Sequence, residues 1–175
     1  TWTNIIPNDE VIGFTRNIQE DYENPNLLFL GTELGLYITI NGGDSWSKFS
    51  KNVPPVAIHY IELQNQTNDL VLGTHGRGVI IIDDISPLRE INEENLSNKL
   101  YFFKRDQFEI QEFGGFSDSF GRETQFFGAN PSLGCEIKYL LPKRHTFGKM
   151  SMEIQDMYGN KIKTLNPGKS KGINT

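Results

Sequence analysis

The sequence contains almost no cysteine and no long hydrophobic run. Cys135 is the single cysteine among 175 residues, which excludes a disulfide within the chain and a thiolate metal cluster. The longest purely aliphatic run, at 79–82, is far shorter than the roughly 20 residues of a membrane-spanning helix. Residues 1–4 do not resemble a charged and then apolar leader. We expect no membrane-spanning or signal segment here, although a leader further upstream stays open and export is not excluded.

Positive charge is also scarce. The chain carries 17 Lys and Arg against 22 Asp and Glu, for a formal net charge of −5, a composition typical of a soluble globular protein. Nucleic acids and anionic membranes are bound through dense Lys and Arg surfaces, so we expect no nucleic-acid partner and no membrane insertion. The three histidines, His59, His75 and His145, stand in separate segments. We therefore expect no metal site, and no cofactor.

A long-period repeat organises the first half of the chain. Residues 28–38 recur as residues 70–81, with Thr32 matched to Thr74, 42 positions later. Residues 2–5 similarly resemble residues 46–49. Units of about 40 to 50 residues with four short strands are typical of β-propeller blades.

Alternating apolar residues and Gly-containing turns predict the strands of these units. In the first unit we expect strands at 11–18, 27–31, 36–40 and 45–49, and in the second at 56–63, 70–74 and 79–82. The second unit lacks an outer strand because Pro87 cannot donate to a ladder. Residues 2–5 are expected to be an outer strand of an earlier blade. A propeller closes with roughly 4 to 8 blades, so this segment predicts the end of a propeller.

The composition changes after this segment. We divide the chain into propeller blades at 1–88, a polar linker at 89–99 and a second β-rich domain at 100–175. Strands are expected at 100–103, 136–141, 150–155 and 161–165, with a hairpin turn at 156–160. Four late lysines are interpreted as a solvated strand face and tail: Lys161, Lys163, Lys169 and Lys171.

One motif resembles a known family. Residues 39–46, Thr-Ile-Asn-Gly-Gly-Asp-Ser-Trp, resemble the Asp-box, [Ser/Thr]-x-Asp-x-Gly-x-x-[Trp/Phe], of sialidase-type, xyloglucanase-type and sortilin-type propellers. Asn41 stands where the family prefers Asp, and its carbonyl can still accept backbone N–H bonds. The resemblance implies a structural role for Thr39, Asn41, Gly43 and Trp46, with the Trp46 indole packed between sheets.

Two further segments extend the resemblance. Residues 73–79 and 83–89 look like the last blade of bacterial sortilin-like, BNR-type propeller proteins. Residues 130–140 and 152–162 are similar to the immunoglobulin-like module that follows such propellers, related to that of flagellar hook-cap proteins. The resemblance implies an all-β chain, the last blades of a β-propeller followed by a partial, truncated immunoglobulin-like β-sandwich. It also implies an extracellular, cell-surface or periplasmic location.

The candidate ligand-binding residues are Glu33, His75 and Arg77. They occupy the turns between second and third strands, at the end of a propeller where ligands usually bind. Arg77, between two glycines, can equally brace a neighbouring blade, and His59 is expected to be packed or channel-lining. The turn glycines do not precede a helix, so they do not predict a phosphate loop.

A glycosidase needs two carboxylic groups about 5 to 10 Å apart. The propeller carboxylates that we consider are Glu10, Glu33, Asp83 and Asp84. Asp83 and Asp84 are adjacent and make a poor pair, because neighbours on a strand point to opposite faces. We assign no catalytic residue.

Three functions remain open. The first is a secreted or cell-surface scaffold for binding or assembly, with a protein or glycan partner and the remaining propeller blades. The second is a glycoside hydrolase of sialidase-like or xyloglucanase-like propeller type whose catalytic carboxylates lie mostly outside this chain. The third is a non-catalytic assembly factor resembling the propellers that help build photosynthetic complexes.

Overall fold

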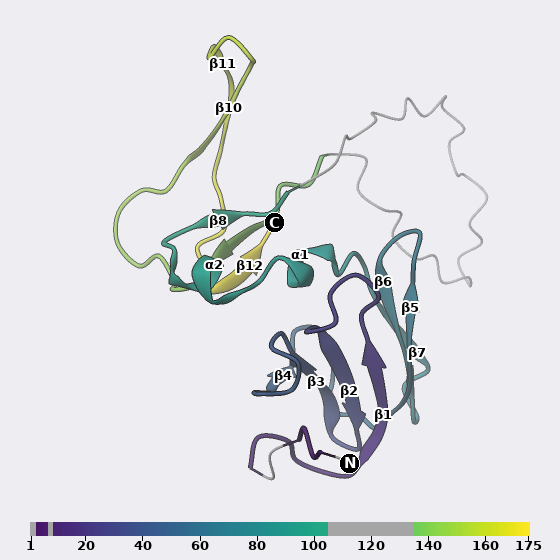
Figure 1. Ribbon diagram of the computed structural model, residues 1–175. Coiled ribbons are helices and arrows are strands. Elements are labelled where there is room, and N and C mark those ends of the chain that lie inside the picture. The colour runs from purple at the N-terminus through teal and green to yellow at the C-terminus, as the bar shows by residue number, and fades with distance from the viewer. Residues whose placement is uncertain (1–2, 7–8, 105–134) are drawn as a thin grey trace, which may run out of the picture. The chain divides into compact units, whose positions relative to one another are not determined.

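A computed structural model describes residues 3–6, 9–104 and 135–175 of the chain (Figure 1). Most of its regular structure is strand in several antiparallel sheets, with two short helices, and this confirms the expectation of an all-β chain. The chain divides into two compact units, Thr1–Leu96 and Ser97–Thr175. The division falls within segment 89–99, which the sequence analysis treats as a linker.

The first sheet is a four-stranded antiparallel meander. Its strands follow one another in space as they do in sequence: β1 (Thr15–Glu20), β2 (Leu28–Thr32), β3 (Gly35–Thr39) and β4 (Ser47–Phe49). Every residue of β2 is buried, as expected for a central strand that is covered on both faces. The outer strands are short or half-exposed, so β2 and β3 form the centre of this half of the unit.

The second sheet repeats the first without its outer strand. Its order is β5 (Ile58–Gln64), β6 (Asp69–Thr74) and β7 (Val79–Ile82). The chain then forms two short helices, α1 (Ser86–Arg89) and α2 (Glu93–Ser97). Pro87 lies in the first turn of α1, where its missing N–H costs no hydrogen bond.

The two sheets pack through a glycine. A Cβ atom added to Gly31 would lie 2.8 Å from the carbonyl oxygen of Ile58, so the start of β5 rests directly on β2. The neighbouring residues Leu28 and Leu30 point to the opposite face of the sheet because side chains alternate along a strand. There they form a core with Tyr37 and Trp46. The first sheet is therefore covered on both faces.

The first strand is shorter than the sequence predicts. We expected it to begin at residue 11, but β1 begins at Thr15. Gly13 has a φ of +94°, which breaks the extended backbone, and Val11 is buried in the core instead. Residues 3–5 carry no regular structure, and the rest of the outer strand expected at 2–5 lies outside the described residues.

The second unit contains two separate sheets. Three strands, in the order β12 (Gly172–Asn174), β9 (Tyr139–Leu141) and β8 (Tyr101–Phe102), form one sheet, and β10 (Met152–Gln155) with β11 (Lys161–Leu165) forms a hairpin that extends from it (Figure 1). The Tyr139 hydroxyl, on a buried ring, donates to the carbonyl oxygen of Gly168 at 2.7 Å.

The four late lysines are exposed, as their interpretation as a solvated strand face and tail expects, but the C-terminal segment also contains a strand that the sequence does not predict. Lys161 and Lys163 do lie exposed on β11. However, the residues after Lys171 form β12, whose Ile173 pairs with Leu140 of β9. The pairing partner lies more than thirty residues earlier in the chain, so the local pattern carries no sign of it.

Candidate functional site

The turns that carry Glu33 and His75 are held in the same way. The Glu33 N–H donates to the carbonyl oxygen of Phe14 at 3.1 Å, and the His75 N–H donates to that of Ala57 at 2.9 Å. Phe14 and Ala57 immediately precede β1 and β5 respectively. Because Gly31 near the end of β2 rests on Ile58 at the start of β5, both turns lie at the same end of the unit.

A threonine closes each of these turns. The Thr32 hydroxyl donates to the carbonyl oxygen of Gly35 at 3.0 Å, and the Thr74 hydroxyl donates to that of Gly78 at 2.7 Å. The two threonines are the pair matched in the sequence repeat. The repeat therefore extends from the strand pattern to individual hydrogen bonds.

Both inner strands contain an irregularity next to the turn. The pairing of β1 with β2 shifts between Thr15 and Asn17, and the pairing of β5 with β6 shifts between Ile58 and Tyr60. Arg16 and His59 are thus the extra, unpaired residues of two β-bulges. Bulges re-aim side chains.

Each bulge residue contacts the turn of its own sheet. Arg16 Nη2 lies 2.7 Å from Glu33 Oε1, and both side chains are partly exposed. The His59 and His75 rings stack, with centroids 5.6 Å apart and an interplanar angle of 18°. The structure therefore pairs Glu33 with a cation and His75 with a second imidazole, two partners that the sequence analysis did not assign.

Arg77 is a cation at this end of the unit without an ion-pair partner among the described residues. Its side chain is exposed, and no ion pair joins it to the described part of the chain. The flanking Gly76 and Gly78 have φ values of +80° and +66°, and nothing lies within 4 Å of a Cβ added to either. Arg77 thus projects from an open turn, and its five donors are available to an external acceptor.

The Asp-box-like turn follows β3. Asn41 Oδ1 accepts the Ser45 N–H at 3.0 Å and the Thr39 hydroxyl at 2.7 Å. The Thr39 hydroxyl oxygen accepts the Gly43 N–H at 3.1 Å. The Asn41 side-chain oxygen thus accepts a backbone N–H, as an aspartate oxygen can, and closes the turn.

Trp46 joins this turn to residues 3–6, which we call the N-terminal segment. Its ring is buried, and its Nε1–H donates to the carbonyl oxygen of Ile5 at 2.8 Å. Its backbone N–H donates to the Glu10 carboxylate at 2.5 Å. Glu10, one of the four carboxylates considered for catalysis, is therefore engaged in the turn.

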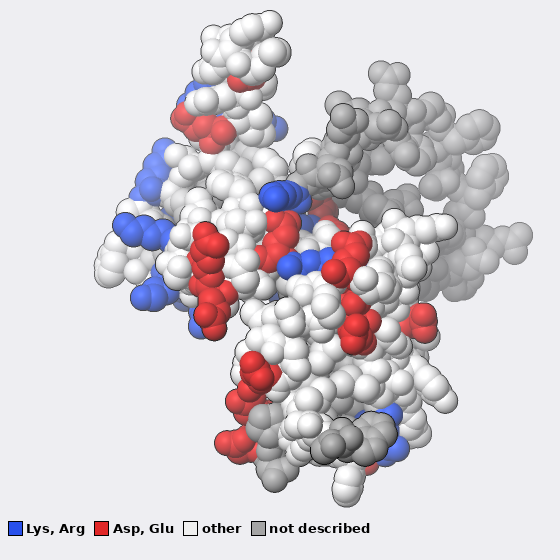
Figure 2. All heavy atoms as spheres, viewed as in Figure 1, with Lys and Arg blue, Asp and Glu red and all other residues white. Residues whose placement is uncertain are grey.

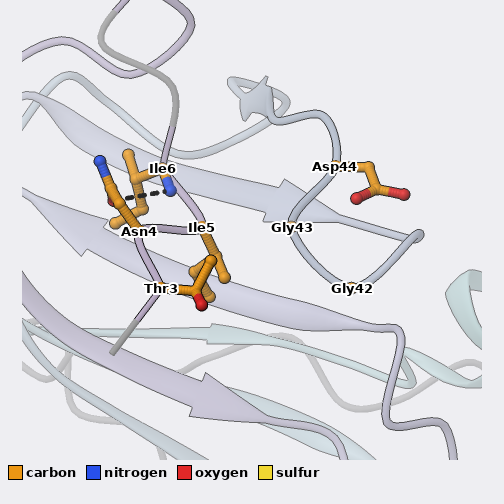
Figure 3. Close-up of a pocket in the computed structure, with 7 residues that line it drawn as sticks. All are labelled: Thr3, Asn4, Ile5, Ile6, Gly42, Gly43 and Asp44. Atoms are coloured by element: carbon orange, nitrogen blue, oxygen red, sulfur yellow. Dashed lines mark hydrogen bonds between the residues drawn. The ribbon is translucent and has the colours of Figure 1, made fainter. Parts of the chain in front are cut away.

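A shallow cavity of about 390 Å³ lies between the N-terminal segment and the Asp-box-like turn (Figure 3). Residues Thr3, Asn4, Ile5, Ile6, Gly42, Gly43 and Asp44 line it. Figure 3 shows the Asp44 carboxylate directed away from the N-terminal segment. With this single carboxylate, the cavity does not provide the acid pair of a glycosidase.

Two of the other considered carboxylates are also engaged, whereas Asp83 is exposed. Glu33 pairs with Arg16, and Asp84 Oδ1 accepts both the N–H and the hydroxyl of Ser86. Within residues 3–6, 9–104 and 135–175, no group of three or more His, Cys, Asp or Glu side chains is arranged to hold a metal ion. No helix in the described ranges is long and apolar enough to cross a membrane.

Sequence reasoning missed a deeply buried charged pair of the first unit. Arg89 Nη2 lies 2.9 Å from Asp21 Oδ1, with side-chain exposures of 9% and 0%. Arg89 Nη1 also donates to Asn68 Oδ1 at 2.7 Å. The partners are 68 positions apart, and although Arg89 ends segment 83–89 of the resemblance, no motif includes both residues. The sequence did not indicate the bulge contacts either, because the 42-residue offset of the repeat matches Arg16 to Ile58, and the bulges at Arg16 and His59 are evident only in the strand pairing.

Comparison with models of known protein families, with curated proteins and with solved structures gives no match to this chain. The site is therefore described by its own geometry: two equivalent turns, two bulge contacts and one exposed guanidinium.

Proposed function

We propose that the chain is the C-terminal part of a sortilin-like, propeller-type scaffold that is secreted or displayed at the cell surface. It binds a protein or glycan partner and performs no catalysis in this segment. In this proposal the first unit comprises the last blades, and the second is an immunoglobulin-like module. The remaining blades of the parent protein are its obligatory structural partners.

The observation that carries this proposal concerns one face of the second sheet. This face is exposed, whereas the corresponding face of the first sheet is buried. In the first sheet, Gly31 pairs with Leu36 and Phe29 pairs with Ile38, and this face lies under the second sheet. The corresponding pairs of the second sheet are Gly73 with Val79 and Val71 with Ile81.

These second-sheet positions are apolar but uncovered. Tyr60, Val79 and Ile81 are 74%, 65% and 57% exposed. A monomeric soluble protein rarely exposes such a row of apolar side chains without a partner. By repetition, the partner is another antiparallel sheet that rests on Gly73 as β5 rests on Gly31.

Thiol accessibility tests this part of the proposal. Ile81→Cys, in a Cys135→Ser background, should react rapidly with a maleimide in the dilute, monomeric 175-residue chain and slowly in the parent protein. Gln66→Cys, in the exposed turn of the same sheet, should react rapidly in both. Equal reactivity of Ile81→Cys in the two proteins would contradict the proposal.

The binding role is supported by the open end of the unit. Arg77 offers fixed donors that suit a carboxylate, and the His59–His75 stack lies at the base of the same turn. Glu33 and Arg16 form the equivalent contact one repeat earlier. In the parent protein, Arg77→Ala should weaken partner binding by at least about 1.5 kcal/mol, the lower figure for a hydrogen bond to a charged group.

Two measurements separate binding from the other roles. Arg77→Ala should leave the melting temperature unchanged, whereas a lowered melting temperature with unchanged affinity would make Arg77 a blade brace. The parent protein should cleave none of a panel of glycans, whether or not it binds them. Cleavage by the parent protein would favour the glycoside hydrolase with carboxylates in other blades.

A further inference from the structure

The net charge of −5 conceals two units of opposite sign. The described residues of the second unit contain ten cationic side chains: Lys99, Lys104, Lys138, Lys143, Arg144, Lys149, Lys161, Lys163, Lys169 and Lys171. They contain three acidic ones: Glu136, Glu153 and Asp156. Figure 2 shows most of the blue spheres over this unit and most of the red ones over the first. The expectation that no anionic surface is bound rested on the average over both units.

Several of these cations lie on one loop. Lys143, Arg144 and Lys149 belong to segment 142–151 between β9 and β10, which we call the basic loop, and all three are exposed. No ion pair joins any of the three to another described residue. The three charges are therefore free to interact with an external anion.

The basic loop is held in place by the segment that leads to β12. The His145 N–H donates to the carbonyl oxygen of Lys169 at 3.0 Å, and Lys169 Nζ donates to that of Gly148 at 3.1 Å. These bonds bring Lys169 and the nearby Lys171 beside the loop. Five cations thus gather around one structural feature.

An apolar side chain lies among these cations in the basic loop. Phe147 is 88% exposed, between Arg144 and Lys149 in sequence. The adjacent β10–β11 hairpin ends in a second apolar tip, where Met157 is 89% exposed beside Tyr158. Exposed apolar tips beside Lys and Arg are typical of segments that adsorb to the interface of an anionic bilayer, because the ring enters the headgroup region while the cations meet the phosphates.

We propose that the basic loop adsorbs to an anionic lipid surface, with Lys143, Arg144 and Lys149 on the headgroups and Phe147 inserted between them. The loop lies on the membrane and does not span it. A lipid surface fits better than single-stranded nucleic acid, since two of the four exposed apolar side chains here, Met157 and Ile162, are aliphatic, and only Phe147 and Tyr158 offer a ring for a base to stack on. The proposal does not depend on the scaffold function.

Vesicle co-sedimentation of the 175-residue chain tests the charge component. The chain should bind phosphatidylcholine vesicles that contain phosphatidylglycerol and should not bind pure phosphatidylcholine. Lys143→Glu with Arg144→Glu should lower binding at least about tenfold, because each cation near the surface contributes separately. Lys48→Glu with Lys51→Glu is the matched control, since it gives the same net charge through residues of the first unit and should change binding little.

Fluorescence tests the insertion of the ring. Phe147→Trp should show a blue shift and quenching by brominated lipid on vesicles with phosphatidylglycerol, and Phe147→Ser should bind several-fold more weakly with an unchanged circular dichroism spectrum. Equal losses in both charge variants would overturn the proposal, as would absence of vesicle binding. Binding to oligonucleotides, heparin or a second copy of the chain, without vesicle binding, would assign the loop to that partner instead.

Discussion

At the residue scale, the first unit depends on a buried ion pair. The Asp21 carboxylate accepts Arg89 and also the backbone N–H groups of Glu23 and Asn24. Burial alone lowers the pKa of Arg89, but the hydrogen bond and charge of Asp21, with the charge of Glu23, outweigh it and raise the pKa above its ordinary value. The guanidinium therefore stays charged and joins the segment after β7 to the loop after β1.

Removal of one partner should leave the other buried and unpaired. We expect Arg89→Met to destabilise the first unit by roughly 3 kcal/mol, as typical for a broken buried pair. Arg16→Met, which removes the partly exposed pair with Glu33, should cost no more than about 1 kcal/mol. Urea unfolding of the two variants measures the difference, and similar midpoints would contradict a structural role for the buried pair.

Gly31 is a second residue on which the packing depends. Gly31→Ala should destabilise the chain by about 1 to 3 kcal/mol, because its new methyl group overlaps the Ile58 carbonyl oxygen and forces a backbone shift. Gly73→Ala is the matched substitution one repeat later, where the atom nearest to the new methyl group is Tyr60 Cβ, at 3.3 Å. Its melting temperature should fall less. Equal losses would show that the sheets do not meet at Gly31.

At the scale of elements, the β10–β11 hairpin depends on its turn. An isolated two-stranded sheet is marginally stable, and this one carries a single ion pair between strands, Lys161 with Glu153 at 2.9 Å. Asp156 accepts the Asn160 side-chain amide at 2.9 Å and the N–H groups of Tyr158 and Asn160. These bonds, the Asn160 side-chain bond first, lower the pKa of Asp156.

The lowered pKa makes the turn sensitive to acid. A carboxyl whose pKa is lower in the folded state stabilises the folded state at pH values above its ordinary pKa, about 4. This stabilisation is lost as the pH falls through the folded-state pKa. We expect the protection factors of the Tyr158 and Asn160 amides, which correct exchange for its intrinsic pH dependence, to fall below about pH 4. In Asp156→Asn the protection factors of these amides should not change over this range, whereas unchanged protection factors in the unsubstituted protein would refute the role of the carboxylate.

At the scale of the whole molecule, the first unit leaves one sheet face and one strand edge open. Strand β7 ends the sheet order β5-β6-β7 without a further partner among the described strands. Exposed edges and apolar faces pair with other chains. The two features lie on the same sheet, so one kind of contact can cover both.

We therefore expect the 175-residue chain to self-associate as its concentration rises. Val79→Lys with Ile81→Lys should shift sedimentation velocity toward the monomer, because two charges on the face oppose its burial. Ile12→Lys with Ile18→Lys, which alters exposed side chains at or before β1, is the comparison and should have less effect. A monomer at all concentrations without substitution would contradict this use of the face.

Local patterns were sufficient to predict much of this chain. The repeat that matches Thr32 to Thr74 located strands β2, β3, β6 and β7, since alternation and glycine turns act over a few residues. The same reasoning placed Glu33 and His75 in equivalent turns. It also expected no fourth strand after β7, because Pro87 and paired charges are local signals.

Only the tertiary structure decided which side chains meet. The stack of His59 on His75, the pairing of Asp21 with Arg89 and the addition of β12 to β9 join residues from 16 to 68 positions apart. No local pattern encodes such contacts, because they depend on bulges, sheet order and burial that exist once the chain has folded. The sequence thus determined most of the strands and their turns, and long-range packing determined strand β12 and the partners of the charged and aromatic side chains.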